Sequence, residues 1–135
     1  MAAEKEPHEY RASLAVFSET IALADLTAAL GSPSAGHDHG DPVSRRKPGA
    51  TKRRGATWIL ESEGPRVRLL EDQIEDLVMF SEEHRGAFDA LAPRPERHIF
   101  CGVFSGTNAQ GGFALEPALM RRLADLDLVV VFDLY

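Results

Sequence analysis

The stretch LLEDQIEDLVMFSEEHRGAFDALA, residues 69–92, decides the fold of this chain. Its apolar residues recur at intervals of three and four, which predicts an amphipathic helix with one apolar stripe. Gly86 is expected to bend this helix or to divide it, and Pro93 to end it. Burial would contribute roughly 1.5–3 kcal/mol for each fully covered apolar side chain, so we expect this helix to supply the backbone of the core. The stripe comprises Leu70, Ile74, Leu77, Val78, Phe88 and Leu91, and it is interrupted at Ser81 and His84.

Segments on both sides of this helix have the patterns of strands. Residues 10–17 and 56–62 alternate between two sets of side chains, which is the period of a strand. Residues 97–105 are largely apolar on both faces and predict a central strand, and residues 113–115 are expected to return as a short antiparallel strand. The last segment, DLVVVFDLY, is rich in β-branched and aromatic residues and predicts a final strand that could form an open sheet edge.

Two shorter helices complete the prediction. Residues 21–31 have helical spacing and end at Gly31, and Pro117 suits the first turn of a helix that runs towards Leu126. The order is therefore β-α-β-α-β-β-α-β. It predicts an α+β two-layer sandwich, with a mixed or mainly antiparallel sheet and the helices on one face. We expect a flexible N-terminal tail at 1–9 and a single domain at 10–135, with a long mobile loop at 32–55.

Composition bounds the class of protein. The chain has 135 residues, of which 44% are apolar and 27% charged, as expected for one compact domain. A single cysteine, Cys101, excludes an internal disulfide and favours the reducing cytoplasm. The start, MAAEKEPHEY, lacks the pattern of a signal peptide, and no run of 18 apolar residues is present. We therefore expect neither secretion nor a membrane span.

The formal net charge of −6 is unevenly distributed. Residues 45–54, RRKPGATKRR, hold six of the fifteen basic residues, so the remainder carries nine basic against 21 acidic residues, a formal charge of −12. A basic segment attracts phosphates, but the acidic remainder repels a nucleic-acid duplex and no nucleic-acid-binding motif is present. Nucleic acid is therefore not the predicted partner. The segment is expected to be solvated, to fold against the acidic surface, or to contact a partner protein.

The stretch HDHGD, residues 37–41, is the candidate for metal chemistry. In an extended conformation, His37, His39 and Asp41 would point to the same side and could converge on one ion. The flanking glycines and prolines instead indicate a turning loop without the rigid support that a metal site needs. We therefore predict no metal or other cofactor. Ser105 does not fit the spacing of a nucleophile elbow, and Cys101 is expected to be a core thiol, so no catalytic residue is predicted.

The C-terminal half of the chain contains Ser105-Gly106, Gly111-Gly112-Phe113, Pro117 and Asp133-Leu134-Tyr135. With Leu30-Gly31, Gly40-Asp41 and Trp58, this pattern resembles an uncharacterised, mainly bacterial family known as domain of unknown function 4279. The resemblance covers residues 10–135. The chain departs from the pattern at Glu116, where a small hydroxyl residue is expected, and in its enlarged loop around HDHGD. The resemblance implies an α+β fold and brings no activity.

Two functional hypotheses follow. The first, which we favour, is a small non-enzymatic binding module, of a kind that could neutralise a partner protein, using its acidic surface and the 32–55 loop. A homodimer through the C-terminal strand is a related expectation. The alternative is a small enzyme or ligand binder with a site between the 105–112 turn and the 32–55 loop. That site would be lined by Asp41, Trp58, Ser105 and Asn108.

Overall fold

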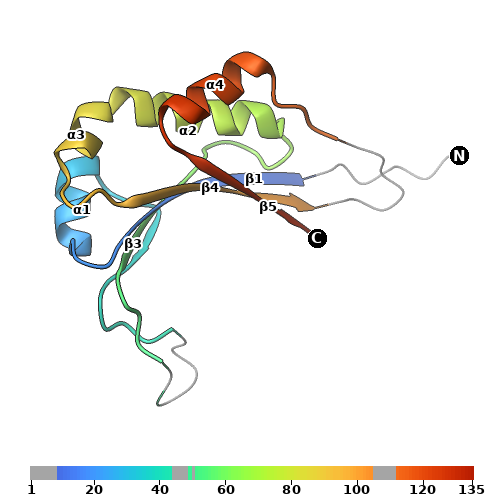
Figure 1. Cartoon of the computed structure of the whole chain (residues 1–135). Helices are drawn as coiled ribbons and strands as arrows, with labels where there is room; N and C mark the ends of the chain where they lie inside the picture. Colours follow the sequence, from blue (N-terminus) through green and yellow to red (C-terminus); the bar gives the residue numbers. More distant parts are fainter. Residues whose placement is uncertain (1–8, 44–48, 50, 105–111) are drawn as a thin grey trace, which may run out of the picture.

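The computed structural model describes residues 9–43, 49, 51–104 and 112–135, and they form a five-stranded sheet with helices packed on one face (Figure 1). The strands lie in the order β2-β3-β1-β4-β5. Their bounds are β1 Glu9–Ser18, β2 Ala35–His37, β3 Ala56–Glu61, β4 Glu96–Phe104 and β5 Val129–Leu134.

The sheet is mixed, with one parallel pair. The central strand β1 pairs antiparallel with both β3 and β4, and β2 pairs antiparallel with β3. The last strand, β5, runs parallel to β4 because the chain crosses over the sheet through a helix before it returns. The predicted α+β class, with a mixed sheet and helices on one face, is confirmed.

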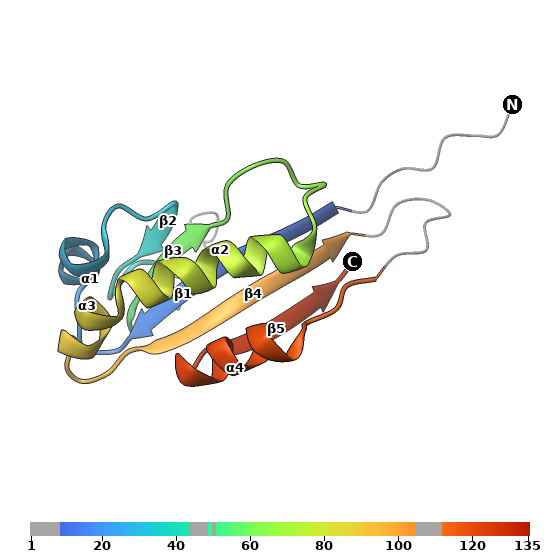
Figure 2. The ribbon, with the colours of Figure 1, turned by 90° about the horizontal axis from the view of Figure 1, so that it is seen from above.

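The helices are α1 Leu23–Leu30, α2 Leu70–Glu83, α3 Arg85–Ala90 and α4 Pro117–Asp125. Viewed from above, α2 lies obliquely over the centre of the sheet, α4 over its β5 side, and α1 and α3 together at one end (Figure 2). The helix predicted at 69–92 is divided into α2 and α3, as its glycine suggested, but the break falls at His84. There the imidazole Nδ1 lies 2.8 Å from the carbonyl oxygen of Phe80, so the side chain competes for the end of α2.

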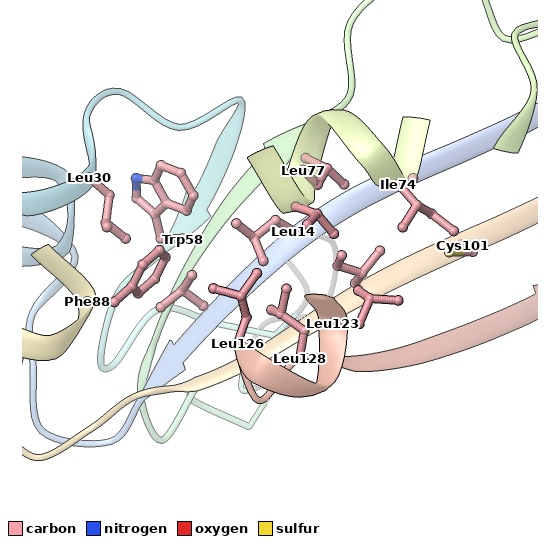
Figure 3. Close-up of a cluster of buried hydrophobic side chains, with 14 of the residues drawn as sticks. Leu14, Leu30, Trp58, Ile74, Leu77, Phe88, Cys101, Leu123, Leu126 and Leu128 are labelled. Atoms are coloured by element: carbon pink, nitrogen blue, oxygen red, sulfur yellow. The ribbon is translucent and has the colours of Figure 1, made fainter. Parts of the chain in front are cut away.

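The core lies between the helices and the sheet. Figure 3 shows Trp58 beside Leu30 and Phe88 at one end of this core, while Ile74 of α2 lies towards Cys101 of β4. All five side chains are at most 3% exposed. The helix stripe recognised in the sequence therefore meets the inward faces of β1, β3 and β4, as an amphipathic helix over a sheet must.

A buried glutamine completes the hydrogen bonding of β1. Beyond the end of β3, the Ala12 amide donates to Gln73 Oε1 at 3.0 Å, and Gln73 Nε2 donates to the Tyr10 carbonyl oxygen at 2.8 Å. The Ser62 hydroxyl also donates to Gln73 Oε1, at 2.7 Å. The side chain thus replaces a neighbouring strand at a place where unpaired backbone groups would be costly.

Two local details differ from the sequence analysis. The segment 32–55, expected as a loop, contains the short strand β2. Residues 38–43 and 51–55, which we call the arm, pair with each other beyond β2, where the Gly40 amide donates to the Arg53 carbonyl at 3.0 Å. The sequence Ala-Gly-His lacks the alternation that predicts strands. This short edge strand forms because its backbone pairs with β3. The strand expected at 113–115 does not form. Phe113 instead stacks on Phe132 at a centroid distance of 5.0 Å and fixes the start of the crossover on β5.

Candidate partner-binding surface

The residues predicted to line a ligand site do not form one in the part of the chain that is described. Trp58 is completely buried, and its indole Nε1 donates to the Gly31 carbonyl at 2.9 Å, so it is a core residue. Its strand has Ala56, Trp58 and Leu60 on one face and Thr57 and Glu61 on the other, so the alternation itself indicated that Trp58 turns inward. Asp41 is exposed in the arm. Ser105 and Asn108 lie outside the described residues.

The arm and the end of β4 lie at opposite ends of the sheet (Figure 1). Ser18 at one end of β1 pairs with Ala56, next to the arm, while Glu9 at the other end pairs with Phe104. Ten residues of extended strand separate these ends, which is about 30 Å. The structure therefore does not bring Asp41 together with the end of β4.

The HDHGD stretch is organised by its own hydrogen bonds. Asp38 Oδ1 accepts from the Leu23 amide at 3.2 Å and so caps the start of α1, and Asp41 Oδ2 accepts from the Asp38 amide at 2.8 Å. The His39 ring lies between Asp38 Oδ1, at 3.2 Å, and the Glu19 carbonyl oxygen. Residues 9–43, 49, 51–104 and 112–135 contain no group of three histidine, cysteine or acidic side chains that could hold a metal ion.

The protonation of this pair follows from these contacts. The Glu19 carbonyl and the Asp38 carboxylate both accept from the ring and raise the pKa of His39. Hydrogen bonds from the His39 and Leu23 amides lower the pKa of the Asp38 carboxyl. The stretch therefore favours an imidazolium and a carboxylate that join the arm to the start of α1.

Cys101 cannot act as a nucleophile in the folded protein. Its side chain is fully buried on the helix side of β4, and this burial raises the pKa of the thiol to about 12. A thiolate is the reactive form, and the core disfavours it. The predicted core thiol is confirmed.

The face of the sheet opposite the helices carries a second set of apolar side chains, which we call the open face. Strand alternation and pairing place Phe17 of β1, Phe100 of β4 and Val131 of β5 on it. Rings stack along this face at centroid distances of 5.8 Å for His98 with Phe100 and 4.7 Å for Phe104 with Tyr135. None of the described helices covers these rings. An uncovered apolar face of this kind marks an interaction surface more often than a solvated one.

The β5 edge adjoins the open face. Val129, Leu134 and Tyr135 are 52%, 77% and 72% exposed, and β5 has only one charged residue, Asp133. Among the strands that the structure describes, none pairs with its outer side. An edge with so few charges lacks the usual protection against pairing with another chain.

Charge around these surfaces is acidic. The open face carries Glu9, Glu61 and Glu96 on its strands, and β5 adds Asp133. The Arg11 guanidinium lies 3.6 Å from the Glu61 carboxylate and the Arg66 guanidinium 3.8 Å from that of Glu9, so ion pairs offset these two charges and leave Glu96 and Asp133. An approaching chain with basic side chains would therefore be attracted to this region.

The family model described as domain of unknown function (DUF4279) matches residues 8–135, so the chain belongs to this family. The match spans the whole sheet and all four described helices, in agreement with the resemblance seen in the sequence motifs. Comparisons with curated proteins and with solved structures give no significant match. No helix within the described residues combines the length and the apolar character needed to cross a membrane.

Proposed function

We propose that this protein is a small non-enzymatic binding module that receives an extended segment of a partner protein at its β5 edge. The observation that carries the proposal is the edge itself, which is six residues long, largely apolar and not paired on its outer side with any strand of the described chain. Strand addition provides affinity through main-chain hydrogen bonds and specificity through alternate side chains. One set of these side chains would rest on the apolar open face beside β5.

Two side chains of β5, Val131 and Asp133, point to the open face. Side chains of an added strand that point to the same face would lie beside them, so we expect an apolar residue opposite Val131 and a basic residue two positions away, opposite Asp133. Charge complementarity favours such a partner over a second copy of this chain, because two copies with a formal net charge of −6 repel each other. By holding this segment against β5, the module would prevent the segment from acting elsewhere, and in this way it would neutralise its partner. The sole, buried cysteine supports a cytoplasmic setting, which belongs to the same proposal.

Selection from a random peptide library on the immobilised protein tests this function. The edge variant combines Val131→Lys with Leu134→Lys, which places two charges on β5. The matched control combines Val43→Lys with Val67→Lys at positions that are 54% and 53% exposed and lie outside β5. Peptides enriched on the wild-type protein are expected to carry an apolar and a basic residue two positions apart, to bind the control variant equally, and to lose at least tenfold in affinity for the edge variant.

Equal binding to the edge and control variants, or no enrichment of basic residues, would refute the proposal. Molar mass from light scattering provides the second readout. A wild-type dimer that the edge variant dissociates would show that β5 pairs with a second copy, and this too would overturn the assignment of the edge to a different protein.

A further inference from the structure

Arg97 is a largely buried cation that has no ion-pair partner among the described residues. It lies at the start of β4, opposite Val16 on the helix side of the sheet, and is only 6% exposed. Its guanidinium carbon lies 4.8 Å from the centroid of the Phe88 ring. In the part of the chain that the structure describes, the guanidinium makes no hydrogen bond and no ion pair. A buried arginine normally has an anion or several acceptors opposite its five donors.

Two adjoining cavities give access to this side chain. One has a volume of about 340 Å³ and includes Arg94, Arg97 and His98 in its wall. The other, of about 190 Å³, is lined by Arg85, Asp89, Arg94, Arg97, Asp125 and Leu126. Arg94 and Arg97 belong to both walls, so a small molecule in either cavity would meet the Arg97 side chain.

The acidic groups nearby do not neutralise Arg97. Asp127 Oδ2 is bound by the Arg94 guanidinium at 3.0 Å, and both of these side chains are exposed. Burial, followed by the positive charge of Arg94, lowers the pKa of Arg97, while Asp127 and Asp89 act in the opposite direction from a greater distance than an ion pair. The Arg97 donors therefore remain available to a ligand. Their position at the floor of two cavities gives that ligand a defined place.

We infer that the Arg97 cavities bind a small carboxylate ligand, and that a free α-amino acid fits them best. The flat guanidinium can donate two parallel hydrogen bonds to a carboxylate, while its face rests on Phe88. A phosphate dianion fits the walls less well, because Asp89, Asp125, Asp127 and Glu96 surround the three arginines. The same acidic groups offer acceptors to the ammonium group of an α-amino acid. Arg97 itself faces the helices, although the first cavity also includes Glu96 and His98 of the open face and Val129 of β5 in its wall.

Ligand titration of the full chain tests this inference. Backbone amide NMR shifts and the melting temperature are measured with glycine, alanine and glutamate as amino acids, propionate as a carboxylate without an ammonium group, and inorganic phosphate, all at millimolar concentration. Amino acids are expected to move the amides of residues 94–98 and to raise the melting temperature. Propionate should act more weakly, and phosphate least.

The variant Arg97→Met distinguishes a ligand-binding role of Arg97 from a structural role. Methionine keeps an apolar stem over Phe88 and removes all five donors, so the folded state should keep its melting temperature or gain a few degrees while amino-acid binding falls at least tenfold. Arg121→Met removes an exposed arginine outside the cavities and should leave binding unchanged. If Arg97→Met does not fold, Arg94→Gln is used in its place, because Arg94 is exposed and lines both cavities.

Each contrary result overturns the inference. Shifts that are absent for every carboxylate would show that water alone satisfies Arg97. Shifts that persist unchanged in Arg97→Met or Arg94→Gln would place the binding elsewhere. Phosphate binding that exceeds amino-acid binding would reject the ligand class. The peptide selection depends on Val131 and Leu134, which line neither cavity, so either proposal can fail without the other.

Discussion

The two faces of the sheet both carry large apolar side chains, but the helices cover only one of them. On the face towards the helices, Trp58 and Ile99 are completely buried. On the open face, Phe100 is 39% exposed and no described helix lies over it. Hydrophobicity alone therefore does not distinguish core from surface in this protein. The distinction comes from the helix stripe of α2, which covers one face and leaves the apolar residues of the other for an external partner.

The largest effect on stability is expected when one aromatic residue on each face is replaced by alanine. Trp58→Ala should lower the free energy of unfolding by about 3–5 kcal/mol, because it opens a cavity in the closed core. Phe100→Ala should lower it by about 1 kcal/mol or less, since its ring is already partly in water. Urea unfolding followed by circular dichroism measures both. Similar losses for the two variants would mean that the open face is covered in solution and would break the comparison.

A smaller effect is expected where the covered face depends on a polar residue. Gln73→Leu leaves the Ala12 amide and the Tyr10 carbonyl without this partner in the interior, so we expect a loss of about 2–4 kcal/mol. Ser62→Ala removes one contact to the same glutamine and should cost about 1 kcal/mol or less. Fluorescence of Trp58, the only tryptophan, follows urea unfolding of both variants. A Gln73→Leu protein as stable as the wild type would show that β1 finds other partners for these groups.

Much of the covered face could be predicted from the sequence. The stripe on residues 69–92 and the alternation along β1 and β3 indicated the layers, because both patterns are fixed by backbone geometry, and the apolar character of β4 indicated a central strand. Parity along β4 also places Arg97 on the same face as Ile99 and Cys101. That signal was present in the sequence, although nothing in it indicated that the arginine would be left without an anion.

The remaining features depend on contacts between distant segments. Ala35-Gly36-His37 becomes a strand because β3 offers it an edge, and Gly36 fits there because a side chain would approach Leu23 within 3.0 Å. Trp58 was predicted to line a site, but the packing of α1 and α3 encloses it. The role of Gln73 depends on where β3 ends, which no local pattern in α2 records. Sequence periodicity thus predicted the layers, while tertiary contacts decide which polar residues they enclose.

The smallest effect is expected at the arm, which belongs to neither face. The pKa of His39 is raised because the folded state stabilises its protonated ring through the Glu19 carbonyl and the Asp38 carboxylate. The contribution of this contact to stability is therefore complete below the unfolded pKa, near the ordinary value of 6.5, and is lost as the pH rises through the folded pKa. NMR titration of the ring should give a value above 6.5 in the wild-type protein.

The variant Asp38→Asn keeps an oxygen that can cap α1 but removes the carboxylate charge beside His39. The pKa of His39 should then fall towards its ordinary value, while the Glu19 carbonyl continues to hold part of the shift, since it is the larger cause. Urea unfolding at pH 6 and pH 8 should show a smaller pH dependence in the variant, without a change at Trp58. An unchanged pKa in Asp38→Asn would assign the whole shift to Glu19. It would also mean that the His39 ring links the arm to the end of β1 through the Glu19 carbonyl, and that the Asp38 carboxylate does not stabilise this link.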